Sequence, residues 1–145
     1  MPDHPYDSEP AAGSERPVQV GVVAERLGLS IRTLHHWDET GLVVPSARSA
    51  GGFRLYTEDD IARLITVRRM KPLGFTLDEM KGLLRALATL DRADADPDEQ
   101  AEARAYVTAC HDRARASCDE LRRKLGWAEE FRDLLADVSY PAGAS

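Results

Sequence analysis

The chain has 145 residues, an apolar fraction of 43% and a formal net charge of −6. This length has room for one globular domain and one extended element, but hardly for two complete cores. Two cysteines are too few for a disulfide framework, and the N-terminus lacks the basic start and apolar run of a secretory signal. No apolar stretch approaches the roughly 20 residues that cross a bilayer. The sequence therefore predicts a protein of the reducing cytoplasm with no membrane span.

The negative charge is concentrated at the two ends of the chain. Residues 1–16 carry one Lys or Arg against four acidic residues, and residues 86–145 carry eight against thirteen. Residues 17–85 carry ten against eight, with His35 and His36 not counted. The middle of the chain therefore permits DNA binding, although the chain as a whole is acidic.

The first half of the chain begins with a tail and continues as two helices. Residues 1–16 mix Pro, Gly, Ser and acidic residues without periodicity, which predicts a disordered tail. Apolar residues over 21–27 predict a helix that Gly28 interrupts, and Ser30 stands where an N-cap starts the next helix. The second helix runs through Leu34 and Trp37 and stops at Gly41. This is the pattern of a helix-turn-helix.

A hairpin and two more helices complete the predicted domain. Residues 42–56 read as a β-hairpin with a small-residue turn over 48–52, which forms a wing after the two helices. Thr57 caps a third helix that ends near Pro72, and Thr76 with Glu79 forms a capping box for a short fourth helix through Leu87. We expect residues 17–90 to form a winged helix-turn-helix DNA-binding domain.

The second half of the chain is predicted to be one long helix. Residues 91–98 are acidic, contain Pro97 and have little to bury, so they are interpreted as a hinge. We expect a helix from 97 to 138, in which the apolar residues from Ala103 onward follow a heptad pattern that is interrupted by Ser117 and Lys124 and weakened by Gly126. Such a helix would be about 60 Å long and needs a partner to stay folded. Residues 139–145 are expected to fray.

Dimerisation is the simplest way to supply that partner. The residues expected in the interface are Val107, Cys110, Ala114, Leu121, Ala128, Phe131 and Leu135. The predicted fold class is mainly α, with a winged helix-turn-helix followed by a C-terminal coiled-coil dimerisation helix.

Cationic and polar side chains gather on the second helix and the wing. The major groove of B-DNA admits a helix, and short polar or cationic residues near its N-terminal end reach phosphates and base edges. Guanidinium groups that bracket a glycine-rich turn suit phosphate oxygens. The candidate DNA-binding residues are Arg32, Thr33, His35, His36, Arg48, Arg54, Tyr56 and Lys71.

The segments VGVVAERLGLSIRTLHHWDETGLVVPSARSAGGFRLYTEDDIARL and VRRMKPLGFTLDEMKGLL together resemble the DNA-binding domain of the MerR family of transcription regulators. The resemblance runs from about Val18 to Leu84 and implies that residues 33–37 lie in the recognition helix and 52–56 in the wing. It also implies a backbone contact for Lys71. Where the family usually has Arg-Tyr-Tyr, this chain has His35, His36 and Trp37, so an imidazole replaces the permanently charged guanidinium at position 35.

The resemblance further implies a mechanism. Family members bind as homodimers to a near-palindromic operator inside an overlong promoter spacer. They then bend and untwist the DNA so that RNA polymerase engages both promoter elements. We expect an activator of this kind, without a cofactor.

Other functions within DNA regulation remain open at this point. Cys110 and Cys118 lie two turns apart, about 12 Å along a helix, so one ion is not ligated by both in the same chain. A packing role is favoured for Cys110, and no metal site is predicted, but a metal- or thiol-responsive site shared across a dimer stays an alternative. Small architectural or excisionase-like DNA binders share the winged pattern, although the long helix argues against them.

Two further classes receive less support. An enzyme would need to use His35 with His36, or Cys110 with His111, but consecutive side chains on a helix diverge by about 100°. No catalytic residue is predicted. A coiled-coil interaction protein that has lost DNA binding is the last alternative.

Overall fold

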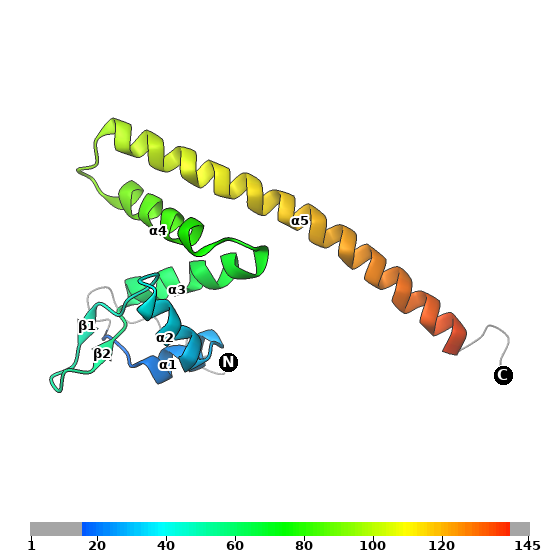
Figure 1. Cartoon of the computed structure of the whole chain (residues 1–145), viewed down its shortest axis with the longest axis horizontal. Coiled ribbons are helices and arrows are strands. Elements are labelled where there is room, and N and C mark those ends of the chain that lie inside the picture. Colours follow the sequence, from blue (N-terminus) through cyan, green and yellow to red (C-terminus); the bar gives the residue numbers. More distant parts are fainter. Residues whose placement is uncertain (1–15, 140–145) are drawn as a thin grey trace, which may run out of the picture. The chain divides into compact units, whose positions relative to one another are not determined.

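The computed structural model describes residues 16–139, so the predicted tails lie outside the described residues except at positions 16 and 139. Two compact units divide between Leu84 and Arg85. The predicted fold class is confirmed: the described chain is mainly helical, with a two-stranded wing and a long C-terminal helix (Figure 1). In order the elements are α1 Val20–Leu27, α2 Ile31–Glu39, β1 Ala47–Arg48, β2 Arg54–Leu55, α3 Glu58–Met70, a 3-10 turn Lys71–Leu73, α4 Leu77–Asp91 and α5 Pro97–Ser139.

Helices α1 and α2 form the predicted helix-turn-helix. Gly28 ends α1 with a left-handed φ of 66°, which a residue without a Cβ adopts at little cost. Ser30 then caps α2, its hydroxyl accepting the backbone N–H of Thr33 at 3.0 Å. The two predicted boundaries of the turn are therefore confirmed.

The core of the first unit joins α3 to these two helices. Val23, Leu34, Leu64 and Val67 are fully buried, and Trp37 is nearly so. The Arg68 guanidinium on α3 donates to the carbonyl oxygen of Leu27 at 2.7 Å, which satisfies a carbonyl at the C-terminal end of α1. Apolar packing and this hydrogen bond together set the position of the helix-turn-helix within the unit.

The wing is a shorter hairpin than the sequence predicts. Its ladder has two rungs, Ala47 opposite Leu55 and Arg48 opposite Arg54. Beyond the ladder, Tyr56 exchanges two backbone hydrogen bonds of 2.8 and 2.7 Å with Val18. The segment before α1 is therefore paired with the returning side of the wing, a contact that the hairpin prediction did not include.

The predicted cap at Thr57 and the predicted capping box at Thr76 and Glu79 are confirmed, and Thr57 also forms a capping box. At the start of α3 the Thr57 hydroxyl accepts the N–H of Asp60 at 3.1 Å, and the Asp60 carboxylate accepts the N–H of Thr57 at 2.9 Å. At the start of α4, Thr76 and Glu79 make the same reciprocal pair at 3.2 and 2.8 Å. Helix α4 is longer than predicted, because it continues to Asp91.

The predicted hinge corresponds to a five-residue connection, 92–96, between α4 and α5. This connection is held by hydrogen bonds: Asp96 accepts the N–H of Glu99 at 2.8 Å, and Arg92 donates to Glu99 at 2.9 Å. The first of these bonds is the main reason why the pKa of Asp96 lies below its ordinary value. Ala95 is buried, so the corner does bury a side chain. The chain divides into its two compact units inside α4 rather than at this corner.

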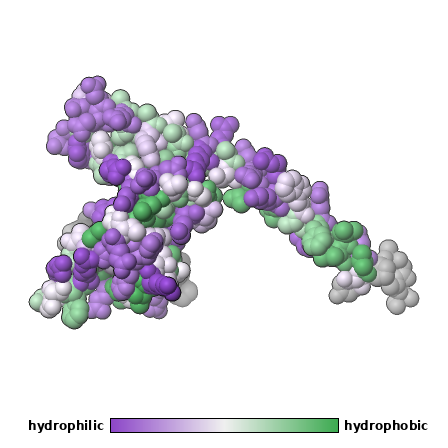
Figure 2. All heavy atoms as spheres, in the orientation of Figure 1, coloured by the Kyte–Doolittle hydropathy of each residue, from purple (hydrophilic) through white to green (hydrophobic). Residues whose placement is uncertain are grey.

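Helix α5 is continuous from Pro97 to Ser139 and passes through Gly126 without interruption. The predicted seam differs along its length: Val107, Cys110 and Ala114 are half-buried within the single chain, whereas the residues from Leu121 onward are exposed. Figure 2 shows the resulting apolar surface on the C-terminal part of the helix. Within residues 16–139, none of the helices has the length and apolar character needed to cross a bilayer.

Candidate nucleic-acid interface

Helix α2 separates a packing face from a polar face. Leu34 and Trp37 are buried, and the Trp37 ring packs in the core. Arg32, His35 and His36 are exposed. Thr33, in the first turn of α2, is half-buried, and its hydroxyl accepts a hydrogen bond from the hydroxyl of the N-cap residue Ser30 at 2.8 Å. The exposed face of α2 therefore carries one arginine and two histidines.

The wing contributes two arginines on neighbouring strands. Arg48 is exposed and donates to the carbonyl oxygen of Gly52 at 3.1 Å, which folds it against the turn of the hairpin. Arg54, opposite Arg48 in the ladder, forms an ion pair with Asp38 of α2. Lys71 is exposed where α3 passes into the 3-10 turn. The wing and α2 are thus joined by a charged contact that the sequence did not predict.

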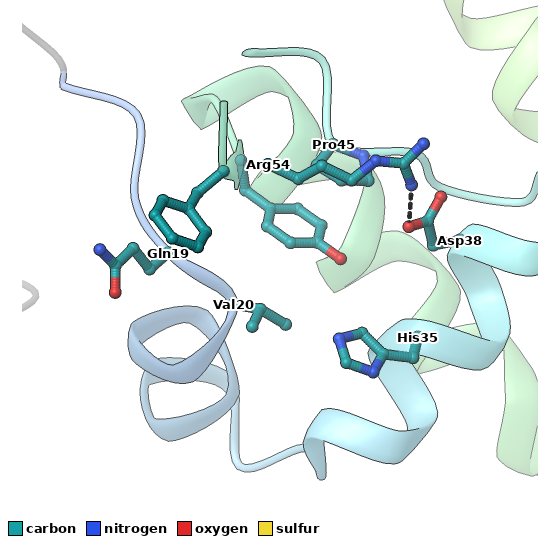
Figure 3. Close-up of a pocket in the computed structure, with 8 residues that line it drawn as sticks. Gln19, Val20, His35, Asp38, Pro45 and Arg54 are labelled. Atoms are coloured by element: carbon teal, nitrogen blue, oxygen red, sulfur yellow. Dashed lines mark hydrogen bonds and ion pairs between the residues drawn. The ribbon is translucent and has the colours of Figure 1, made fainter. Parts of the chain in front are cut away.

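A pocket of about 360 Å³ lies where α1, α2 and the wing meet (Figure 3). His35 and Asp38 are one turn apart on α2, and Arg54 reaches Asp38 from the wing (Figure 3). The lining residues are Gln19, Val20, His35, Asp38, Pro45, Phe53, Arg54 and Tyr56. The pocket thus combines an apolar floor with charged and titratable groups.

Tyr56 was predicted to contact DNA, and its burial contradicts this. Tyr56 is only 2% exposed, and its backbone is paired with that of Val18 just beyond the end of β2. Burial raises the pKa of the Tyr56 phenol above its ordinary value, and the carboxylates of Asp38 and Asp60 add to the increase. Tyr56 is a core residue that forms part of the pocket wall.

A buried carboxylate holds the base of the wing. Asp60 is fully buried and accepts the backbone N–H of Ser46 at 2.9 Å and its hydroxyl at 2.8 Å, and it also pairs with Arg63. Burial favours the protonated form, but hydrogen bonds from Thr57 and Ser46 outweigh it, so the pKa of Asp60 is lowered. Because Ser46 directly precedes β1, this network fixes where the wing leaves the helices.

The structure brings together some of the predicted residues and not others. His35, Arg54 and Tyr56 line one pocket, whereas Arg32, His36, Arg48 and Lys71 are exposed outside it. Sequence reasoning missed Asp38, Ser46 and Asp60 as site residues. Opposite charges on α2 and the wing were the only signal for the Asp38 contact, and they do not specify which residues pair.

The cysteines lie on α5, away from these elements in the chain. Cys110 is half-buried and Cys118 is exposed. In the part of the chain that the structure describes, no group of three His, Cys, Asp or Glu residues could hold a metal ion.

Comparison with known proteins places these features in a family. The model of the MerR HTH family of regulatory proteins matches residues 18–87. An HTH-type transcriptional regulator of Pseudomonas aeruginosa is 34% identical over 83% of this chain and 82% of its own length. The transcriptional activator TipA of Streptomyces coelicolor is 38% identical over 77% of this chain. The match covers only 39% of the length of TipA.

A solved structure has the same fold. The MerR-family regulator HiNmlR, which lacks the sensor domain and was solved bound to promoter DNA, matches 86% of this chain and 90% of its own. The TM-score is 0.65 and the identity is 21%. These relatives are transcriptional regulators and not enzymes, which removes the catalytic interpretation of the histidines and cysteines. The chain belongs to the MerR family of DNA-binding transcriptional regulators.

Proposed function

We propose that the protein binds a near-palindromic promoter operator as a homodimer in the cytoplasm, deforms the operator DNA and activates transcription by RNA polymerase. Two copies would place two α2 helices in successive major grooves on one side of the duplex, about 34 Å apart. Part of the binding free energy then offsets the cost of bending and untwisting the DNA between them.

The observation that carries the proposal is the set of exposed arginine and histidine side chains on α2 and the wing of one compact unit. Arg32 and His36 lie on the exposed face of α2, and Arg48 lies on the hairpin that follows. A helix with polar side chains fits the major groove, and arginines on an adjacent hairpin suit the flanking phosphates. We infer that α2 reads base edges while the wing and Lys71 contact the DNA backbone.

Homodimer formation is inferred from the C-terminal part of α5. Leu121, Phe131 and Leu135 are 53%, 61% and 48% exposed in the single chain. These residues and Ala128 recur at heptad spacing on one side of the helix, which is the pattern of a helix that packs against another helix. The half-buried residues Val107, Cys110 and Ala114 contribute less area to such a contact.

One relative supports the direction of regulation. TipA is named a transcriptional activator. Because the chain spans only part of TipA, activation by this protein needs its own test.

Footprinting on fragmented genomic DNA from the source organism, followed by transcription from the protected promoter with purified RNA polymerase, tests the proposal. We expect a protected two-fold site between the promoter elements, and transcript yield that rises when the protein is added. Equal binding to all fragments would contradict operator recognition, and a falling transcript yield would contradict activation.

A further inference from the structure

The ion pair between Asp38 and Arg54 joins the recognition helix to the wing. Asp38 belongs to α2 and Arg54 to β2, and the contact lies at the pocket where these elements meet (Figure 3). Among the residues that line this pocket, Asp38 is the acidic one, beside His35 and Arg54. If this pocket faces DNA, as the proposed function implies, an acidic group there opposes phosphate binding, so its presence needs a physical account.

The two partners differ in exposure. The Asp38 side chain is 16% exposed, whereas that of Arg54 is 49% exposed. A guanidinium has five N–H donors in a rigid plane, and the contact with Asp38 is made through Nη1 alone. The Arg54 guanidinium therefore keeps N–H donors on its exposed side, while the ion pair with Asp38 fixes its position. A long side chain held in this way loses less conformational freedom when it binds a phosphate.

We propose that Asp38 is a specificity-determining positioning residue, which fixes Arg54 for one phosphate of a correctly placed operator and weakens binding to all other DNA. The inference rests on the proposed function. The negative charge of Asp38 repels every duplex to a similar extent. When α2 recognises its operator, the DNA backbone lies in one defined position beside the wing. A fixed Arg54 favours only a duplex whose phosphates lie in that position. Asp38 thus raises the ratio of operator to random binding.

The neighbouring residue Glu39 offers a matched control. It lies on the same helix, is exposed and carries the same charge. Asp38→Gln and Glu39→Gln each remove one negative charge, but only the first removes the contact with the wing. The two variants therefore separate the effect of charge from the effect of position.

The experiment measures affinity by fluorescence anisotropy for the footprinted operator and for a random duplex of equal length. It uses the full chain at two salt concentrations, with circular dichroism to check folding. Glu39→Gln should strengthen binding to both duplexes by the same factor. Asp38→Gln should strengthen random binding to a similar degree but not operator binding, so that the operator-to-random ratio falls about fivefold to tenfold.

A second variant keeps the test decisive if Asp38→Gln folds poorly. Arg54→Gln breaks the same pair from the wing and should also lower the ratio, and adding Asp38→Gln to it should change the ratio no further. An unchanged ratio in Asp38→Gln, or additive effects in the double variant, would overturn the inference. If the wild type itself does not distinguish the two duplexes, the proposed function fails instead.

Discussion

The first compact unit and the C-terminal part of α5 differ in how far their apolar side chains are exposed. In the first unit Leu34 and Leu64 are fully buried within the chain, while on α5 Trp127 and Phe131 are more than 60% exposed. The first unit therefore contains its own stabilising core. The end of α5 has an apolar face that gains stability only from a contact outside the helix. The difference lies in where apolar side chains are buried: inside the chain in the first unit, and not within the single chain at the end of α5.

The largest expected effect tests the first half of this comparison. Leu64→Ala should lower the free energy of unfolding by about 3 kcal/mol, since it removes buried apolar area and leaves a cavity. Thermal and urea unfolding of the full chain measure the loss. Val22→Ala is the control, because Val22 is largely exposed and its truncation should change stability by less than about 0.5 kcal/mol. Equal losses in the two variants would contradict a core of this kind.

The second prediction concerns the exposed face of α5. Phe131→Asp should weaken homodimer formation about a hundredfold, equivalent to about 2.7 kcal/mol, because two carboxylates would enter an apolar contact. Sedimentation equilibrium over a range of protein concentrations measures the change. Glu130→Ala, about 100° away around the helix, should leave the dissociation constant nearly unchanged. A dimer that tolerates Phe131→Asp would place the interface elsewhere.

The third prediction returns to the first unit and to its pH dependence. Asp60→Asn should cost about 2 kcal/mol, because the buried charge accepts several hydrogen bonds. The folded-state pKa of Asp60 is lowered, so its contribution is complete above the unfolded pKa of about 3.9 and is lost as pH falls through the folded pKa. Urea unfolding of both proteins between pH 3 and pH 7 should show their stabilities converging toward acid. A constant difference across this range would remove Asp60 as the cause.

The smallest expected effects have opposite signs in the two regions. Gly28→Ala should destabilise the protein by about 1 kcal/mol, because φ is +66° there and a Cβ in this conformation is strained although no atom obstructs it. Gly126→Ala, at an unobstructed helical position of α5, should stabilise by up to about 1 kcal/mol. Melting temperatures of the two variants check both signs. A gain at Gly28 or a loss at Gly126 would contradict the conformations described.

Local features of the fold were predictable from the sequence. Ser30, Thr57 and Thr76 each cap a helix through a residue three positions later, and such short-range chemistry is readable from spacing alone. The predicted helix from Pro97 to Val138 likewise matches the bounds of α5 within a residue.

Contacts between distant segments were not predictable in the same way. The pairing of Asp38 with Arg54, and of Val18 with Tyr56, depends on how the wing packs on the helices, which no local pattern specifies. Heptad spacing also did not distinguish Cys110, which the chain itself partly covers, from Leu121, which stays exposed. Tyr56 was misassigned because an aromatic residue in a wing suits either a core or a DNA contact.

The short ladder of the wing has a consequence for protein engineering. With only two rungs, the hairpin owes its orientation to anchors outside its turn, at Ser46, Arg54 and Tyr56. Residues 50 and 51 are therefore open to randomisation in a library that seeks new operator preferences, whereas Ser49 should be kept because its hydroxyl accepts the backbone N–H of Phe53 at 3.1 Å. Position 52 should remain glycine, since its φ is +85°. Replacement loops would then be displayed on a stem that the rest of the domain keeps in place.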